Sequence, residues 1–251
     1  MATSSRPSVE REPEIDYPTS DGRPMGETDL HRQDMADVIA TLQAHFTADP
    51  MVYVSGNLLL YYERGNKRKH ISPDVFVVLG VKKSPPRDYY LLWEEGKGPD
   101  VVIEITSKTT RREDQTKKLI LYRDVLQVPE YFQFDPREDY LRPSMQGFHL
   151  SAGEYVPIAP VENRLPSHQL GLYLERDGEE LRLFDPKTNR RLLTALETTA
   201  AAQRLAAADR QIAAEALRKE AEARQLAARV QAENDRQRLE IEDLKRRLSG
   251  S

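Results

Sequence analysis

Two carboxylates stand at or within strand-like segments of this chain, where acidic residues are uncommon. Asp74 follows Pro73 and precedes the apolar run VFVVL, and Glu104 lies among the β-branched residues of VVIEIT. A lone buried carboxylate is costly, so each acid needs a partner if it is buried. A neighbouring turn could hold Asp74, and a buried arginine or lysine could pair with Glu104. Neither arrangement would require any chemistry.

The same two acids could instead converge on one divalent cation, if their strands are neighbours in a sheet. Mg²⁺ binds a few hard oxygen atoms and keeps several waters, so two carboxylates and a backbone carbonyl are sufficient protein ligands. Such an ion activates a bound water and neutralises the charge that develops on a phosphate. A lysine nearby would position that water or stabilise the transition state.

Hydrophobic periodicity and turn residues predict the elements that would position these acids. A helix is expected from Thr28 to Asp49, because apolar residues recur there at helical spacing. Another is expected at 112–126, with Tyr122 in the core. The main strands are expected at 51–62, 71–81, 100–106 and 130–135, and shorter ones follow as far as residue 185. The pattern indicates an α/β (α+β) fold with one central mixed sheet flanked by helices.

Composition divides the chain into three segments. Residues 1–24 are polar, contain four prolines and show no period, so we expect a flexible arm. Residues 25–191 hold the predicted sheet and form the folded domain. Residues 192–251 are rich in Ala, Glu, Arg, Gln and Leu and lack Pro, which is typical of a long helix.

The end of that long segment fits a heptad repeat, which predicts a dimerising coiled coil. Asn234 stands at a seam position, where asparagine can fix the register of a dimer. The alanine-rich first half fits no single register well, and a solvated single helix is the alternative. The two columns of the seam are Ala227, Asn234, Ile241 and Leu248, and Ala223, Val230, Gln237 and Leu244.

Composition also excludes several classes of site. The 251 residues include no cysteine, which rules out disulfides, a thiolate nucleophile and cysteine-ligated zinc. The formal net charge of −4 argues against simple electrostatic binding of nucleic acid. We find neither a secretory signal nor an apolar run long enough for a membrane helix, so a cytoplasmic protein is expected.

Several motifs, in order and at matching spacing, resemble those of the Uma2 proteins, a bacterial group with the PD-(D/E)xK restriction-endonuclease-like fold. They are GETDLHRQDM, YVSGNLLLYYE, PDVFVV, PDVVIEITSKTTRREDQTKKLILY and VPEYFQFDP. The resemblance extends over roughly residues 20–190 and leaves the C-terminal helix outside. It implies a restriction-endonuclease-like core that uses Mg²⁺ or Mn²⁺ to cleave phosphodiester bonds.

The resemblance also implies roles for individual residues. Asp74 and Glu104 match the two motif acids and would bind the metal. Where the simple motif has its lysine, two residues after the glutamate, this chain has Thr106. The Uma2 pattern carries the lysine on the following helix, where Lys118 matches. Lys117 is excluded, because adjacent helical residues point about 100° apart.

Further residues are assigned by the same comparison. Glu27 and His31, four residues apart on one helical face, match a polar pair on the first helix, and Glu27 is a candidate catalytic acid. Apart from the resemblance, Lys108, Arg111 and Arg112 are candidates for binding nucleic acid, and a solvated turn is the alternative for the two arginines. One departure is RDVLQVPEY, after Tyr122, which lacks the usual glycine and is one residue longer.

The sequence therefore predicts a Mg²⁺-dependent endonuclease, with DNA as the expected substrate and a homodimer as the expected assembly. The alternative is a non-catalytic scaffold that keeps a degenerate nuclease fold and binds partners through its C-terminal helix. The acidic net charge and the threonine at the simple lysine position favour this alternative, and fold alone does not establish activity.

Overall fold

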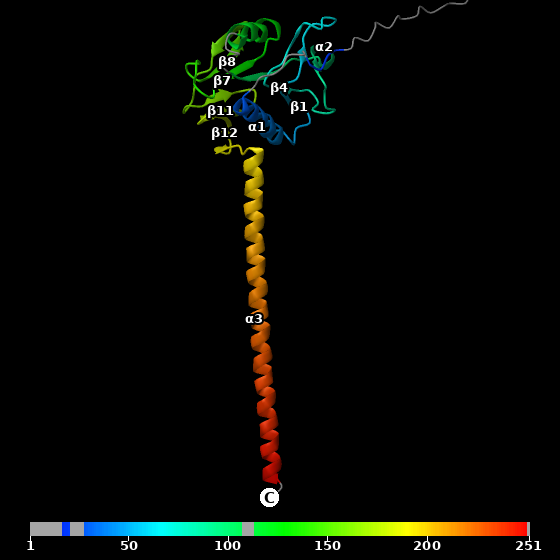
Figure 1. Ribbon diagram of the computed structural model, residues 1–251, viewed down its shortest axis with the longest axis vertical. Coiled ribbons are helices and arrows are strands. Elements are labelled where there is room, and N and C mark those ends of the chain that lie inside the picture. The colour runs from blue at the N-terminus through cyan, green and yellow to red at the C-terminus, as the bar shows by residue number, and fades with distance from the viewer. Residues whose placement is uncertain (1–16, 21–27, 107–112, 250–251) are drawn as a thin grey trace, which may run out of the picture. The chain divides into compact units, whose positions relative to one another are not determined.

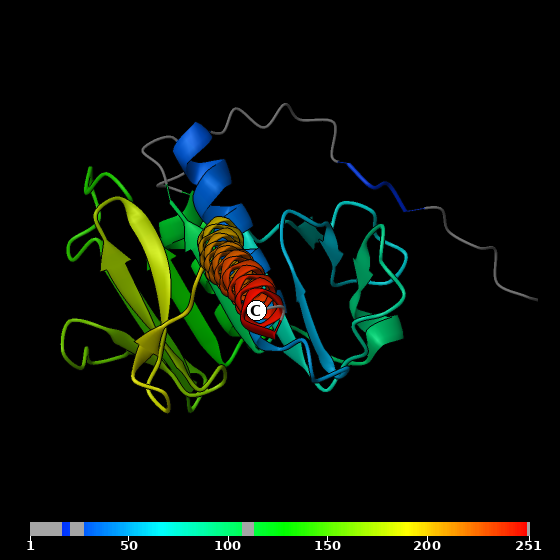
Figure 2. The same ribbon diagram turned by 90° about the horizontal axis from the view of Figure 1, so that it is seen from below.

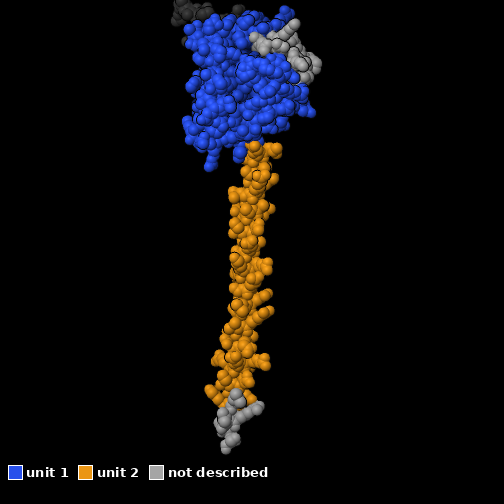
Figure 3. Space-filling model, turned by 90° about the vertical axis from the view of Figure 1, so that its left-hand side faces the viewer, with its two compact units in different colours: residues 1–195 blue, residues 196–251 orange. Residues whose placement is uncertain are grey.

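A computed structural model describes residues 17–20, 28–106 and 113–249 of the chain (Figure 1). It divides into two compact units, residues 1–195 and 196–251 (Figure 3), and each is described by itself. The elements of the first unit are α1 (Asp29–His45), β1 (Val52–Ser55), β2 (Leu60–Tyr61), β3 (His70–Ile71), β4 (Val75–Leu79), β5 (Tyr90–Leu91), α2 (Leu92–Glu95), β6 (Val101–Ile105), η1 (Glu113–Lys118), η2 (Leu121–Val125), β7 (Glu130–Phe134), β8 (Met145–Ser151), β9 (Glu154–Pro157), β10 (Leu165–Ser167), β11 (Leu172–Asp177), β12 (Glu180–Asp185) and β13 (Arg190–Arg191).

A six-stranded mixed sheet in the order β1-β4-β6-β7-β8-β9 forms the centre of this unit. Strands β6 and β7 are parallel, and the other neighbours are antiparallel. Both central strands, β6 and β7, are buried along their whole length, which explains their apolar, β-branched and aromatic composition. The predicted α/β fold with a central mixed sheet is confirmed.

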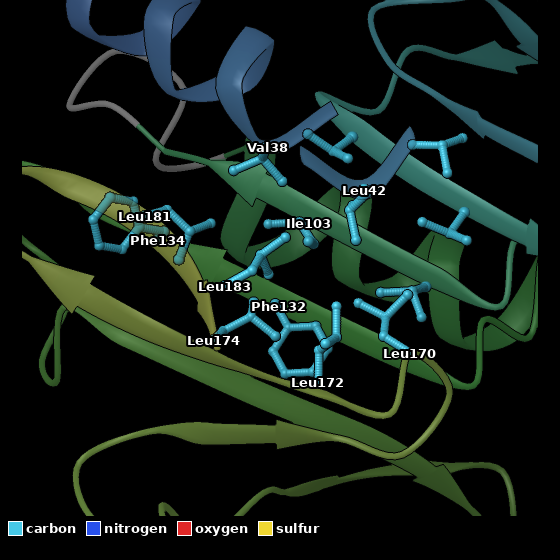
Figure 4. Packing of buried hydrophobic residues seen from close by; sticks show 14 of the residues in the cluster. Val38, Leu42, Ile103, Phe132, Phe134, Leu170, Leu172, Leu174, Leu181 and Leu183 are labelled. Atoms are coloured by element: carbon cyan, nitrogen blue, oxygen red, sulfur yellow. The ribbon is translucent and has the colours of Figure 1, made fainter. Parts of the chain in front are cut away.

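The two faces of β6 belong to different hydrophobic cores, as its alternation predicts. Ile103 packs in one core with Val38 and Leu42 of α1 (Figure 4). Val102 packs in the other with Tyr122. Glu104 shares the alternation of Val102, so it enters the core on the face that the η1–η2 segment covers.

Two smaller sheets cover the central one, whereas the sequence predicted a single sheet. The sheet β10-β11-β12-β13 packs its leucines on the Ile103 face, and the sheet β3-β2-β5 packs on the Val102 face. Figures 1 and 2 show these two small sheets on opposite sides of the unit. The later strands bury their alternating apolar residues by stacking face to face on the central sheet. The alternation in sequence would be the same if these strands extended the edge of the central sheet.

Helix α1 begins where the sequence predicted and ends earlier. The side chain of Thr28 accepts a hydrogen bond from the His31 backbone N–H, so it caps the helix. The helix ends at His45, short of the predicted Asp49. Its buried face includes the polar residues His31 and Asp34 beside the apolar stripe. Two ionisable side chains, His31 and Asp34, therefore point from α1 into the unit.

The helical segment after β6 has wide π-type turns at η1 and η2 instead of a regular α-helix. The backbone N–H of Leu126 donates to the carbonyl of Leu121, five residues back, at 3.0 Å. Gln127 then adopts a left-handed φ of 48°, at the position where the usual glycine is missing. These two features accommodate the longer RDVLQVPEY segment without moving Tyr122 out of the core, where it is fully buried.

Part of the N-terminal arm lies on the small β3-β2-β5 sheet. The ring of Tyr17 is buried, 4.9 Å from the ring of Tyr61, and its hydroxyl accepts a hydrogen bond from the Gly65 N–H at 2.8 Å. Tyr61 in turn donates to the carbonyl of Pro18 at 2.7 Å. Residues 17 and 18 are thus attached to the folded unit. Of the predicted flexible arm, residues 1–24, the structure describes residues 17–20.

The second unit is the long helix α3 (Ala195–Ser249), which confirms the predicted C-terminal helix. From residue 201 onwards, all of its described side chains are exposed. The side chains of Leu244 and Leu248, two of the predicted seam residues, lie outside those that the structure describes. Within the described residues, no helix combines the length and the apolar character that a membrane crossing requires.

Candidate active site

Asp74 lies immediately before β4, beside the end of the antiparallel strand β6 that carries Glu104. The last register pair of β4 and β6 joins Val75 to Ile103, and one further step brings Asp74 opposite Glu104. The N–H of Ile105 donates to Oδ2 of Asp74 at 2.8 Å and fixes this end of the ladder. The condition for a shared site, that the two acids belong to adjacent strands, is therefore met.

Glu104 is fully buried, and each of its carboxylate oxygens has a donor from the η1–η2 segment. Lys118 Nζ lies 2.8 Å from Oε2, and the Tyr122 hydroxyl donates to Oε1 at 2.5 Å. Burial raises the pKa of Tyr122 well above its usual value, and the negative charge of Glu104 raises it further. Tyr122 therefore keeps its proton and remains a donor to the carboxylate.

The lysine at the site is Lys118. Its side chain is 16% exposed and points inward, whereas Lys117 is exposed. Lys118 also acts on the second acid, because its positive charge lowers the pKa of Asp74. One ammonium group thus influences both carboxylates, which places the acids and the lysine at a common centre.

Asp74 is less buried than Glu104 and is held by α1. Its side chain is 13% exposed, and His31 Nε2 lies 3.4 Å from Oδ1. Burial raises the pKa of Asp74, but the hydrogen bond from His31 and the charge of Lys118 outweigh it, so that the pKa lies below its usual value. Asp74 is therefore an ionised, partly accessible carboxylate.

Thr106 occupies the position that holds lysine in the simple motif. Its hydroxyl donates to the carbonyl of Phe134 at 3.1 Å, and the side chain is buried. This residue therefore contributes to the junction of β6 and β7. The positive charge at the site comes from Lys118, on the following helical segment.

Gly56, just after β1, lets the backbone approach Asp74 closely. A Cβ atom at this position would lie 2.0 Å from the carbonyl oxygen of Asp74 and 2.6 Å from Cδ1 of Ile39. Neither distance is compatible with a side chain. The strand segment of the acid, α1 and the end of β1 thus meet at a point where only glycine fits.

Asp34 is a third buried acid on the inner face of α1. It is 2% exposed, and its Oδ2 has no hydrogen-bond partner among the described residues. Burial raises its pKa to about 7, against the lowering effect of the hydrogen bond from the Leu181 backbone. Asp34 therefore titrates near neutral pH, one helical turn from His31.

The donor set at the centre fits a magnesium ion. Asp74 and Glu104 offer hard carboxylate oxygens, the type of ligand that Mg²⁺ prefers. No cluster of three or more His, Asp or Glu residues suited to a metal occurs among the described residues. Two carboxylates are nevertheless enough for Mg²⁺, which keeps several of its waters.

Four predicted site residues cannot be placed. Glu27, Lys108, Arg111 and Arg112 lie outside the described residues. In contrast, Tyr122 was predicted as a core residue, and it is both a core residue and a donor to Glu104. The spacing of Lys118 and Tyr122, four residues apart on one helical face, was the sequence signal for this second role.

The comparison with protein-family models agrees with the residue pattern. A family model described as "Uma2: Putative restriction endonuclease" matches residues 5–177. A solved structure, of a "putative nuclease belonging to DUF820" from Anabaena variabilis ATCC 29413, has 14% sequence identity and a TM-score of 0.43, covering 61% of this chain and 81% of that chain. No curated protein sequence matches. Because the family model covers more than half of the sequence, the chain belongs to the Uma2 family.

Proposed function

We propose that this protein is a Mg²⁺- or Mn²⁺-dependent endonuclease that hydrolyses phosphodiester bonds of DNA. The observation that carries the proposal is the position of Asp74 opposite Glu104, with Lys118 Nζ 2.8 Å from Glu104. Two carboxylates beside the ends of neighbouring strands, with a lysine from the following helical segment, are groups suited to metal-assisted phosphodiester hydrolysis. Membership of a family described as restriction endonucleases supports the same reaction class.

In this mechanism Asp74 and Glu104 would hold the metal. A bound Mg²⁺ would supply an activated water and neutralise charge on the phosphate. Lys118 orients the attacking water and offsets the negative charge that develops in the transition state. Tyr122 and Lys118 fix the orientation of Glu104, and His31 keeps Asp74 ionised. The chain thus provides oxygen ligands whose positions are set before the substrate binds.

The Glu104–Lys118 pair would also suit a purely structural role, because a buried glutamate needs a cation. This is the scaffold alternative, in which the fold is kept and the chemistry is absent. Metal binding at Asp74 distinguishes the two functions, because the scaffold alternative requires no metal at this carboxylate.

The test is cleavage of supercoiled plasmid DNA and of single-stranded DNA by the purified protein. Reactions contain Mg²⁺, Mn²⁺ or EDTA, and the variants are Asp74→Asn and Glu104→Gln. The control is Glu130→Gln, because Glu130 is a buried acid of the neighbouring strand β7 that accepts hydrogen bonds from Ser167 and His168. We expect metal-dependent nicking that both site variants lose and the control retains.

A matching metal titration separates the nuclease from the scaffold. Mn²⁺ should raise the thermal unfolding temperature of the wild-type protein, since a ligand that binds the native state stabilises it. The increase should disappear in Asp74→Asn. If the wild-type protein shows neither cleavage nor a metal-dependent shift in its unfolding temperature, the scaffold remains as the function.

We also propose that α3 pairs two copies of the chain. Five large apolar side chains lie within about 60° of one another around the helix, at the 100° per residue of an α-helix. They are Leu205, Ile212, Leu226, Val230 and Ile241, all at least half exposed. This stripe joins the alanine-rich first half to the seam that contains Asn234, because 4-residue steps connect Leu226, Val230 and Asn234. A second helix would remove the stripe from water.

A further inference from the structure

The turn between β2 and β3 carries a concentration of positive charge. Residues 62–69 read YERGNKRK, with four cations and one acid, whereas the whole chain has a net charge of −4. The four cations are Arg64, Lys67, Arg68 and Lys69, and all are exposed. The turn is therefore an exception to the acidic character of the protein.

This basic turn has a defined backbone. The N–H of Tyr62 donates to the carbonyl of Lys69 at 3.1 Å, and the N–H of Lys69 donates to the carbonyl of Asn66 at 3.0 Å. The Gly65 N–H donates to the hydroxyl of the buried Tyr17 at 2.8 Å. The backbone that carries the cations is therefore held by hydrogen bonds. Little conformational entropy of this backbone would be lost when a ligand binds.

Three cations of the turn, Lys67, Arg68 and Lys69, form no ion pair with an acid among the residues that the structure describes. Glu63, the acid within the turn, accepts a hydrogen bond from the Asn66 side chain at 3.0 Å. Three such cations held on an ordered turn are suited to a polyanion.

The turn is also close to the candidate active site. Strand β3 ends at Ile71, and Asp74 follows three residues later. Five residues separate Lys69 from Asp74, so their Cα atoms are at most about 18 Å apart even if the chain is fully extended. Ile71 packs in the same hydrophobic core as Tyr122, the donor to Glu104. The turn is therefore connected through β3 to Asp74 and to the hydrophobic core that contains Tyr122.

We propose that the basic turn, residues 64–69, binds the phosphodiester backbone of DNA beside the bond that is cut. This inference rests on the proposed nuclease function. Lysine and arginine contacts with phosphates position a protein on DNA without reading its sequence. The upper limit of about 18 Å corresponds to roughly five nucleotides of one strand, at about 3.4 Å per nucleotide. The turn would thus hold DNA a few nucleotides from the scissile phosphate, and the acids would act on the bond itself.

The test compares two triple variants with the same change in charge. The first is Lys67→Gln/Arg68→Gln/Lys69→Gln. The control, Arg137→Gln/Lys187→Gln/Arg190→Gln, removes three exposed cations elsewhere in the same unit. Fluorescence anisotropy measures binding of a labelled DNA duplex in EDTA, so that no DNA is cut, at several salt concentrations. Circular dichroism verifies that both variants are folded.

Loss of phosphate contacts changes the salt dependence of binding in a defined way. Each lost contact reduces the slope of log K against log salt by about 0.9, so three contacts reduce it by about 2.7. We expect this reduction and weaker binding at low salt in the turn variant, with the control unchanged. Equal slopes in the turn variant and the wild type, equal losses in both variants, or no salt-dependent binding by the wild type would overturn the inference.

Plasmid cleavage by Glu104→Gln, measured in parallel, separates this inference from the proposed function. If Glu104→Gln abolishes cleavage while the turn variant binds like the wild type, the nuclease stands and the basic turn has no part in binding. If the turn variant loses its salt slope while Glu104→Gln cleaves normally, DNA binding by the turn stands and the proposed active site is wrong.

Discussion

The hydroxyl of Tyr122 donates to Oε1 of Glu104 at 2.5 Å, one helical turn after Lys118, which occupies Oε2. Both oxygens of a fully buried carboxylate are thus oriented from one short helical segment. The orientation of Glu104 depends on this segment as much as on the strand that carries it, and the first prediction follows from that dependence.

Tyr122→Phe should weaken metal-dependent cleavage and the apparent affinity for Mn²⁺. The phenylalanine ring keeps the packing against Tyr131 but leaves Oε1 of Glu104 without its donor. An unsatisfied buried acceptor costs about 1–3 kcal/mol, which urea unfolding would measure. Tyr155→Phe is the control, since Tyr155 donates to the Val128 carbonyl, away from the acids. Equal activity of the two variants would exclude a positioning role for Tyr122.

Lys118→Gln should reduce the cleavage rate at saturating metal by at least about a hundredfold, the order expected for loss of a charge that stabilises the transition state. Lys117→Gln should cleave like the wild type, because that side chain is exposed. Breaking a buried pair also destabilises by about 3–5 kcal/mol, so single-turnover assays should be run at a temperature at which circular dichroism shows a folded protein. Cleavage by folded Lys118→Gln at the wild-type rate would remove the lysine from the mechanism.

Asp34 should make the protein less stable as the pH rises from about 4 to about 7. Burial raises its folded-state pKa from 3.8 to about 7, so the native state holds a proton that the unfolded state releases. The free energy of unfolding therefore falls by up to about 1.4 kcal/mol per pH unit in this window and is constant above it. Asp34→Asn should lack this contribution. Urea unfolding at pH 5, 6, 7 and 8 measures the difference between the two proteins, and parallel profiles would contradict the assignment.

The apolar stripe of α3 predicts a dimer that depends on one helix face. Leu226→Glu/Val230→Glu should convert the dimer to a monomer in sedimentation equilibrium, because it places charges in the proposed interface. Leu217→Glu/Leu239→Glu is a matched control, since both leucines are exposed on the same helix but point roughly away from the stripe. A monomeric wild-type protein, or equal dissociation in both variants, would refute pairing through this face.

The sequence was sufficient to predict the central sheet and the centre of the candidate site. Alternation in VVIEI predicted the two faces of β6, and the apolar run VFVVL after Asp74 predicted a second strand, whereas the pairing of the two strands was only a condition. These predictions rest on local sequence patterns, because a buried strand requires apolar residues along its length. The choice between Lys117 and Lys118 rested on the resemblance and on helical geometry, and the described contacts of Lys118 are in accord with it.

Features that depend on long-range contacts could not be predicted in the same way. The buried position of Asp34 depends on β12, about 150 residues away in sequence. The sheet β10-β11-β12-β13 stacks on the central sheet. The two-residue period of its strands would be the same if they paired with the edge of the central sheet instead. The π-type turn of η2 lies in the segment that joins Tyr122 and Val128, and both of these side chains are fully buried by packing against distant parts of the fold. In each case tertiary packing decided between local conformations.

Gly56 has a consequence for experiments on this protein. A single methyl group there would collide with the backbone of Asp74, although Gly56 itself has no functional group. Gly56→Ala should therefore displace an acid of the candidate site while every ionisable side chain remains in the chain. If it folds, such a variant would provide a cleavage-deficient protein of unaltered charge, with which DNA could be trapped uncut and its path across the surface mapped.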